Sequence, residues 1–98
     1  SDEVARDASW KAWIATTDAL RGFLLSQGLT EKKLPKSERQ RNDTLAEYCN
    51  ERMRLLYRSI RGEIHENGYY EGMIDYIFLF EAMNDVKNFI YRCENGNK

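Results

Sequence analysis

The chain has 98 residues, of which 42% are hydrophobic and 32% are charged, and its formal net charge is −1 at pH 7. This length supports one modest hydrophobic core, so we expect a single domain over residues 1–98, and the two cysteines and one proline exclude disulfide-rich and fibrous classes of protein. No apolar stretch is long enough to cross a bilayer and no signal-peptide pattern opens the chain, which predicts a cytoplasmic protein.

The first predicted element is a helix over residues 2–26. Ser1 is a common N-cap residue followed by two carboxylates, and Gly28 stands just past the end of the periodic pattern, as a C-terminal glycine does. The residues that share one face of this helix are Trp10, Trp13, Thr17, Leu20 and Leu24. A neighbouring stripe of small side chains, which would let another helix approach closely, consists of Ala5, Ala8, Ala12, Ala15 and Ala19.

A basic joint over residues 29–41 leads into the second predicted helix, which spans 36–66. Pro35 suits the first turn of this helix, whereas the capping-box spacing of Thr44 and Glu47 would start it near residue 43; we favour the earlier start. Its predicted core stripe consists of Leu45, Cys49, Met53, Leu56, Ile60 and Ile64. Cys49 and Cys93 are expected to be free, buried thiols, because a helical hairpin would hold them apart along its axis.

The third predicted helix spans 69–93, after a turn at Asn67 and Gly68. Its first half is apolar nearly all round: one face holds Tyr76, Leu79, Met83, Val86 and Ile90, and the other holds Tyr70, Met73, Ile77 and Phe80. Two apolar faces need two neighbouring helices. The sequence therefore predicts an all-α fold, a small up-down-up three-helix bundle in which helices two and three form a hairpin, the N-terminal helix packs on it and the third helix is the most buried.

Charge is distributed unevenly along the chain. Residues 1–31 carry a net charge of −2, residues 32–61 carry +5 and residues 62–98 carry −4. The cations that open the middle third are Lys32, Lys33, Lys36, Arg39 and Arg41. Such a cluster attracts phosphate backbones, so nucleic-acid binding through residues 32–61 is one hypothesis. The sequence pI of about 5.8 and the lack of aromatic residues among these cations favour a protein-facing role instead.

A second cationic group lies on the middle helix, where Arg54, Arg58, Arg61 and His65 share the side away from the predicted core stripe. His65 is the only histidine, and Arg58 with His65 has the loose spacing of dimeric helical ribonucleases, which extends the nucleic-acid hypothesis to RNA cleavage. A solvated cationic face near a helix C-terminus explains the same residues without chemistry. We therefore predict no enzymatic activity, no catalytic residue, no metal site and no cofactor.

The sequence favours a non-enzymatic protein-interaction module, of the adaptor, inhibitor or immunity-type class. Aromatic, methionine and arginine side chains at a surface are typical of binding hot spots, and a bundle of this size cannot hide every aromatic residue, so Trp10 and Tyr57 are also expected near the surface. The predicted partner-binding residues form an apolar centre with an arginine rim: Tyr70, Met73, Ile77, Phe80, Arg54, Arg58 and Arg61. The expected partner is an acidic protein or a second copy of this chain, with nucleic acid as the alternative and no membrane.

Overall fold

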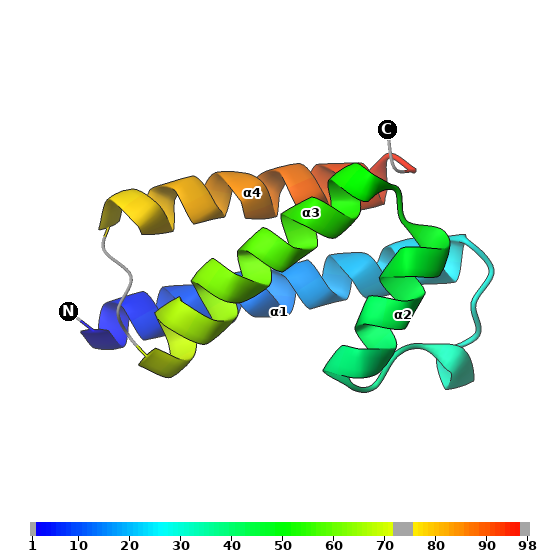
Figure 1. The fold of residues 1–98 in the computed structure, drawn as a ribbon, viewed down its shortest axis with the longest axis horizontal. Coiled ribbons are helices and arrows are strands. Elements are labelled where there is room, and N and C mark those ends of the chain that lie inside the picture. The colour runs from blue at the N-terminus through cyan, green and yellow to red at the C-terminus, as the bar shows by residue number, and fades with distance from the viewer. Residues whose placement is uncertain (1, 72–75, 97–98) are drawn as a thin grey trace.

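The computed structural model describes residues 2–71 and 76–96, which form helices and no strand. Three long segments lie side by side, and α3 runs opposite to α1 and α4, while the short helix α2 crosses one end of the bundle (Figure 1). The elements are α1 (Asp2–Ser26), the 3₁₀ turn η1 (Glu31–Lys33), α2 (Glu38–Tyr48), α3 (Glu51–Ile60), the π-helix η2 (Arg61–Glu71) and α4 (Tyr76–Glu94). The predicted all-α bundle is confirmed, with four α-helices in place of three.

Helix α1 has the bounds that the sequence predicts, although Ser1 lies outside the described residues. Its C-terminus is a Schellman motif: the Gly28 N–H donates to the Leu25 carbonyl at 3.1 Å and the Leu29 N–H donates to the Leu24 carbonyl at 3.2 Å. Gly28 has φ +101°, the left-handed region in which a Cβ is strained. The glycine therefore ends the helix and turns the chain into the basic joint.

The second predicted helix is wrong in its extent, because it is divided at Cys49 and Asn50. Cys49 has an extended backbone, and the Asn50 side chain accepts a hydrogen bond from the Met53 N–H at 2.9 Å, which makes Asn50 the N-cap of a new helix. The chain consequently changes direction, so α2 lies across the bundle rather than continuing along it (Figure 1).

The start of α2 falls between the two predicted positions. Ser37 is the N-cap, and its hydroxyl accepts from the Gln40 N–H at 3.2 Å. The predicted capping box at Thr44 is wrong, because the Thr44 hydroxyl donates to the Gln40 carbonyl at 2.7 Å from within the helix. The preceding joint is anchored by Leu34, which is buried in the core.

The turn predicted at Asn67 and Gly68 is also wrong, since both residues lie within η2, which continues from α3. The third predicted helix corresponds to α4, which begins at Tyr76 and ends at Glu94. Residues 72–75, between η2 and α4, lie outside the described part of the chain. The hairpin of the last two long segments and their antiparallel direction agree with the prediction (Figure 1).

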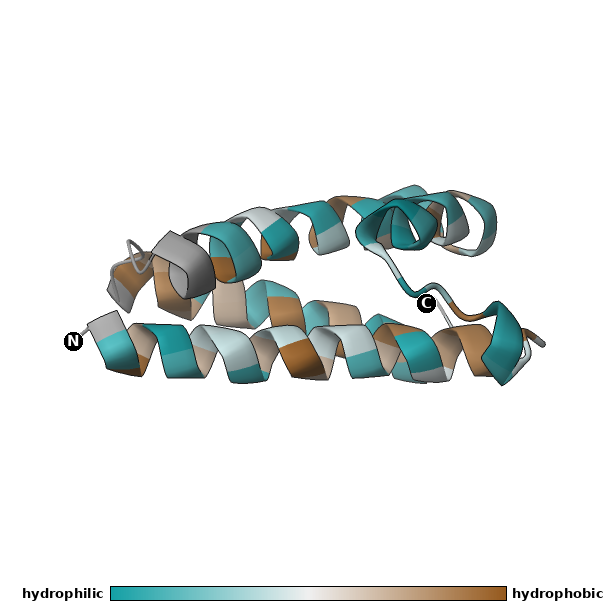
Figure 2. Ribbon diagram, turned by 90° about the horizontal axis from the view of Figure 1, so that it is seen from below, coloured by the Kyte–Doolittle hydropathy of each residue, from teal (hydrophilic) through white to brown (hydrophobic). Residues whose placement is uncertain are grey.

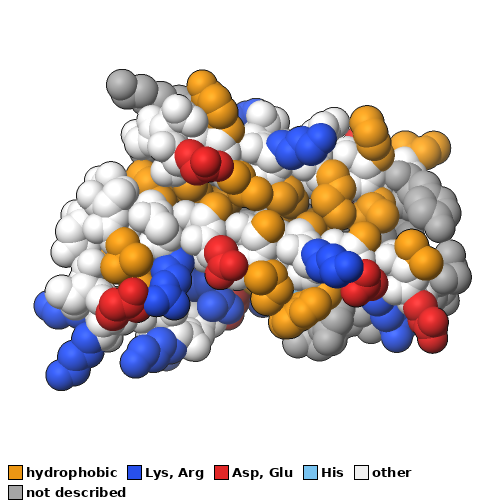
Figure 3. Space-filling model, turned by 180° about the vertical axis from the view of Figure 1, so that it is seen from behind, with side chains coloured by type: hydrophobic (Ala, Val, Ile, Leu, Met, Phe, Trp, Pro, Cys, Tyr) orange, Lys and Arg blue, Asp and Glu red, His pale blue; other side chains and the backbone are white. Residues whose placement is uncertain are grey.

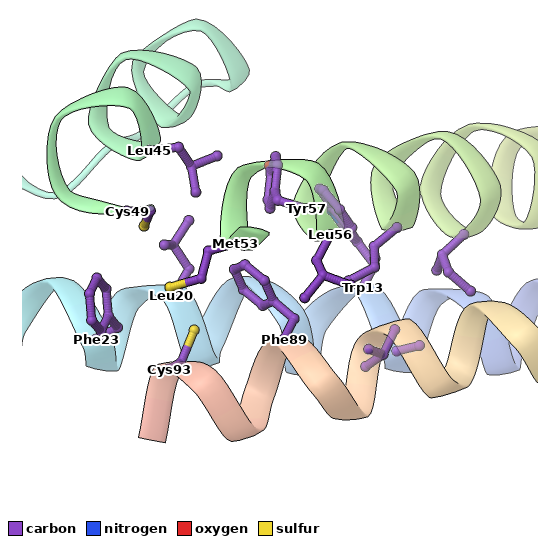
Figure 4. Close-up of a cluster of buried hydrophobic side chains, with 14 of the residues drawn as sticks. Trp13, Leu20, Phe23, Leu45, Cys49, Met53, Leu56, Tyr57, Phe89 and Cys93 are labelled. Atoms are coloured by element: carbon purple, nitrogen blue, oxygen red, sulfur yellow. The ribbon is translucent and has the colours of Figure 1, made fainter. Parts of the chain in front are cut away.

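The core is a single cluster contributed by all of the α-helices (Figure 4). All six residues of the stripe predicted for the second helix are buried, although the stripe is divided between α2 and the continuous segment formed by α3 and η2. Helix α4 adds its own buried row, which consists of Ala82, Val86, Phe89 and Cys93. Both cysteines are free, and burial raises the pKa of Cys49 to about 11 and that of Cys93 to about 12, so their thiolate forms are scarce.

Small side chains on α1 adjoin α4, which is its most extensive neighbour. Ala5 and Ala12 are buried, and Ala8, Ala15 and Ala19 are half-buried, as expected for a stripe that lets another helix come close. Apolar side chains gather along the seam between these two helices (Figure 3). Helix α2, in contrast, consists mostly of hydrophilic residues (Figure 2). Among the described residues, no helix combines the length and the apolar character needed to cross a membrane.

Gly22, within α1, and Gly28, in the turn that follows it, offer a matched test of where this helix ends. Gly28→Ala is expected to lower the free energy of unfolding by about 1 kcal/mol, because alanine is strained at positive φ. Gly22→Ala is expected to raise it by roughly 0.5–1 kcal/mol, because Gly22 is helical and nothing lies within 4 Å of an added Cβ. Urea denaturation followed by circular dichroism measures both changes, and equal signs would contradict the assignment of the turn.

Candidate binding surfaces

Helix α4 leaves one side uncovered by the rest of the molecule. Ile77 is 71% exposed, Phe80 is 70% exposed and Tyr91 is 62% exposed, whereas the opposite side of the helix is buried from Ala82 to Cys93. The expectation that this helix is the most buried one is therefore wrong, because α1, α3 and η2 all pack on the same side of it. Of the other two residues predicted here, Tyr70 lies in η2 and its side chain is not described, and Met73 lies outside the described residues.

The three predicted arginines come together in a different place, a cleft between α2 and α3 with a volume of about 420 Å³. Arg54, Arg58 and Arg61 line it from α3 and the start of η2. The α2 side contributes Asn42, Leu45 and Ala46. No residue of α4 lines this cleft, so the arginines and the exposed side of α4 form two separate surfaces rather than one apolar centre with a cationic rim.

Two of these arginines are held by neighbours, and the third is not. Arg54 Nη1 donates to the Cys49 carbonyl at 2.7 Å. Arg61 makes two ion pairs, with its Nε 3.0 Å from Glu38 Oε1 and its Nη1 2.8 Å from Glu66 Oε1. Arg58 is exposed, and it forms no ion pair within the described residues.

A polar cluster at the base of α2 connects this helix to α3. The Glu38 carboxylate accepts hydrogen bonds from Arg41 Nη2 at 3.1 Å and from the Tyr57 hydroxyl at 3.1 Å, beside its ion pair with Arg61. Arg41 Nε also donates to the Tyr57 hydroxyl at 3.0 Å. Tyr57 is completely buried, so its expected surface position is wrong, and burial, reinforced by Glu38, raises the pKa of its hydroxyl.

His65 lies against α1 rather than on a solvated cationic face. Its ring stacks on Trp13 with the centroids 4.5 Å apart and the planes 16° apart. Burial lowers the pKa of His65, and the nearby positive charge of Arg61 lowers it further. His65 does not line the arginine cleft, so the structure does not bring it together with Arg58 in one pocket.

This environment makes folding depend on pH. Because the folded state disfavours the imidazolium, the unfolded chain, with a histidine pKa of 6.5, binds the proton more tightly. The free energy of unfolding is therefore expected to fall as the pH drops below about 6.5. Chemical denaturation at pH 7.5 and pH 5.5 measures the change, and a His65→Phe variant, which keeps an aromatic ring on Trp13, should show a smaller one; an unchanged pH dependence would contradict this account.

The five cations predicted in the basic joint do not all lie on one surface. Lys32, Lys33 and Lys36 line a shallow depression of about 480 Å³ together with Gln40. Arg39 is exposed, but Arg41 belongs to the Glu38 cluster and is half-buried there. One of the five cations predicted to bind nucleic acid therefore has a role in packing α2 onto the bundle.

Neither a metal-binding group nor a similarity to known proteins assigns a function to these surfaces. The described residues contain no group of three or more His, Cys, Asp or Glu side chains arranged to hold a metal ion. No protein-family model matches the chain, and comparisons with curated proteins and with solved structures found no match. The exposed side of α4 and the arginine cleft are therefore the two features of the molecule that bear on its function.

Proposed function

We propose that this chain is a non-enzymatic protein-interaction module that docks through the exposed side of α4, which we call the α4 face: Ile77, Phe80, Asn84, Lys87 and Tyr91. The observation that carries the proposal is the exposure of Ile77 and Phe80, which are 71% and 70% accessible although both are large and apolar. Contiguous apolar side chains left in water are typical of interaction sites. Arg54, Arg58 and Arg61 line the separate cleft and not the edge of this face. The residues of the α4 face alone therefore determine which partner fits it.

The pattern of the α4 face favours a second copy of this chain as the occupant. Ile77 and Tyr91 each stand seven residues from Asn84, about two helical turns on either side of it. When two copies of α4 pack antiparallel with Asn84 at the twofold axis, Ile77 of each copy therefore meets Tyr91 of the other. Such self-complementarity is what a closed twofold dimer requires.

The polar residues of the α4 face fit the same arrangement. Lys87 and Phe80 share one edge of the helix, and in the antiparallel pairing the Lys87 ammonium approaches the Phe80 ring of the other copy, a favourable cation–π geometry. The two Asn84 amides meet at the axis and can hydrogen-bond to each other, which fixes the register at a cost in affinity. Because few apolar side chains are buried, we expect a dissociation constant of about 1 µM or weaker.

Sedimentation equilibrium over protein concentrations from about 1 µM to about 1 mM tests this proposal. We expect a reversible monomer–dimer equilibrium that Phe80→Lys abolishes, because the new ammonium would face Lys87 of the other copy, where two like charges repel each other and have no counter-charge. Phe80 is exposed in the monomer, so the variant should keep the helical circular dichroism spectrum of the parent chain.

The matched control is Leu55→Lys, since Leu55 is a large apolar residue that is 50% exposed on α3, outside the α4 face. This variant should dimerise like the parent chain. Equal loss of dimer in both variants would overturn the assignment of the interface to α4. A parent chain that stays monomeric at the highest concentration would overturn self-association and make a different protein the occupant of this face.

A further inference from the structure

The cleft between α2 and α3 is a separate site from the α4 face, and the charged residues that line it are all positive. Its lining residues include three arginines and no carboxylate. Its volume of about 420 Å³ falls within the range of small-molecule sites. We propose that this cleft binds a small organic phosphate, with its phosphate group on Arg54 and Arg58 and its organic part on Leu45 and Ala46.

The positive charge that is left unpaired in the cleft is about equal in size to the negative charge of a phosphate monoester. Arg61 is already neutralised, because two carboxylates, those of Glu38 and Glu66, lie within 3.0 Å of its guanidinium. Arg54 donates to a neutral carbonyl, and Arg58 makes no ion pair within the described residues. Two guanidinium charges therefore remain for a ligand, and a phosphate monoester carries a charge of about −1.5 to −2 at pH 7.

One of the two guanidinium groups, that of Arg54, is oriented before the ligand arrives. Each guanidinium has five N–H donors in a planar fork, and a phosphate group accepts two of them side by side. Arg54 is oriented by its bond to the Cys49 carbonyl, which uses only one of its donors. Arg54 and Arg58 are four residues apart on α3, so their side chains project from neighbouring positions on one side of the helix.

The remaining walls favour a small molecule over a nucleic acid. The α2 side offers one amide, Asn42, and the apolar side chains of Leu45 and Ala46, a lining that suits the organic part of a ligand. Among the described residues, none that lines the cleft is aromatic, whereas single-stranded nucleic-acid sites ordinarily stack bases on aromatic side chains.

The test uses phenyl phosphate and inorganic phosphate as probes, with sodium chloride at matched ionic strength as the reference. Calorimetric titration of the intact chain should give saturable binding of phenyl phosphate, tighter than that of inorganic phosphate. Arg58→Gln should weaken binding about tenfold or more, because a charged hydrogen-bonding partner of the phosphate is lost. Arg58 has no ion pair to break, so the variant should remain folded by circular dichroism.

Arg52→Gln is the matched control, since Arg52 is an exposed arginine of the same helix that does not line the cleft. It should change the affinity by less than about twofold, because it removes the same charge from outside the site. Equal losses in the two variants would overturn the site, as would heats no larger than those of the chloride reference. A single-stranded RNA oligonucleotide that binds more tightly than phenyl phosphate and loses its affinity in Arg58→Gln would overturn the small-molecule assignment in favour of nucleic acid.

Discussion

Replacing Phe89 by alanine is expected to lower the free energy of unfolding by about 3–5 kcal/mol, a large part of the total for a domain of this size. Phe89 is fully buried at the centre of the core, and its ring centroid lies 6.0 Å from that of Tyr57 (Figure 4). Alanine would leave a cavity between α3 and α4, which helices held by many other contacts can close only in part.

Phe80→Ala provides the control for this experiment, because it deletes the same ring from the same helix at a position that is 70% exposed. It should change the free energy of unfolding by less than about 0.5 kcal/mol. Urea denaturation of both variants, at a protein concentration of about 0.1 µM so that little dimer forms, gives the comparison. Similar losses at the two positions would mean that the core is not organised around Phe89.

Glu38→Ala is expected to lower the free energy of unfolding by about 2–3 kcal/mol. The Glu38 carboxylate receives hydrogen bonds from Arg41 and Tyr57 and an ion pair from Arg61. Its removal leaves Arg41 without a counter-charge, leaves Arg61 with Glu66 alone, and leaves the buried Tyr57 hydroxyl without its acceptor. The side chain is 25% exposed, so water moderates this loss below that of a fully buried ion pair.

Glu47→Ala on the same helix is the matched control, since Glu47 is exposed and forms no ion pair within the described residues. Its effect should stay within about 0.5 kcal/mol. Denaturant titration followed by tryptophan fluorescence reports both variants, because Trp13 lies 5.6 Å from the Tyr57 ring and senses this region. If Glu38→Ala were as mild as Glu47→Ala, the cluster would contribute nothing measurable to stability.

Patterns of local sequence predicted the helices and most of the core, because burial follows the helical period. The stripe from Leu45 to Ile64 is buried as predicted even though the helix breaks within it, since both helices present that stripe to the same core. The break itself had a sequence signal, Asn50 followed by Glu51, which is a common way to begin a helix. The capping-box spacing of Ser37 and Gln40 likewise marked the true start of α2.

The positions of the polar side chains could not be predicted in the same way, because they depend on contacts between distant residues. Tyr57 meets Glu38 across nineteen residues, and only after the chain reverses at Asn50. His65 lies on Trp13 because η2 packs against α1. The arginine cleft needs α2 as its second wall, and a continuous helix over 36–66 would have had no such wall.

The crossing helix α2 is expected to be less stable than the bundle formed by α1, α3 and α4. It fully buries a single residue of its own, Leu45, packs Tyr48 partly against the core and otherwise attaches through the Glu38 cluster, so we expect it to detach while α1, α3 and α4 stay packed. Amide hydrogen exchange should therefore be faster in α2 than in the rest of the bundle. Since α2 forms one wall of the arginine cleft, a ligand in that cleft would slow this exchange, and binding would be linked to the local folding of one helix.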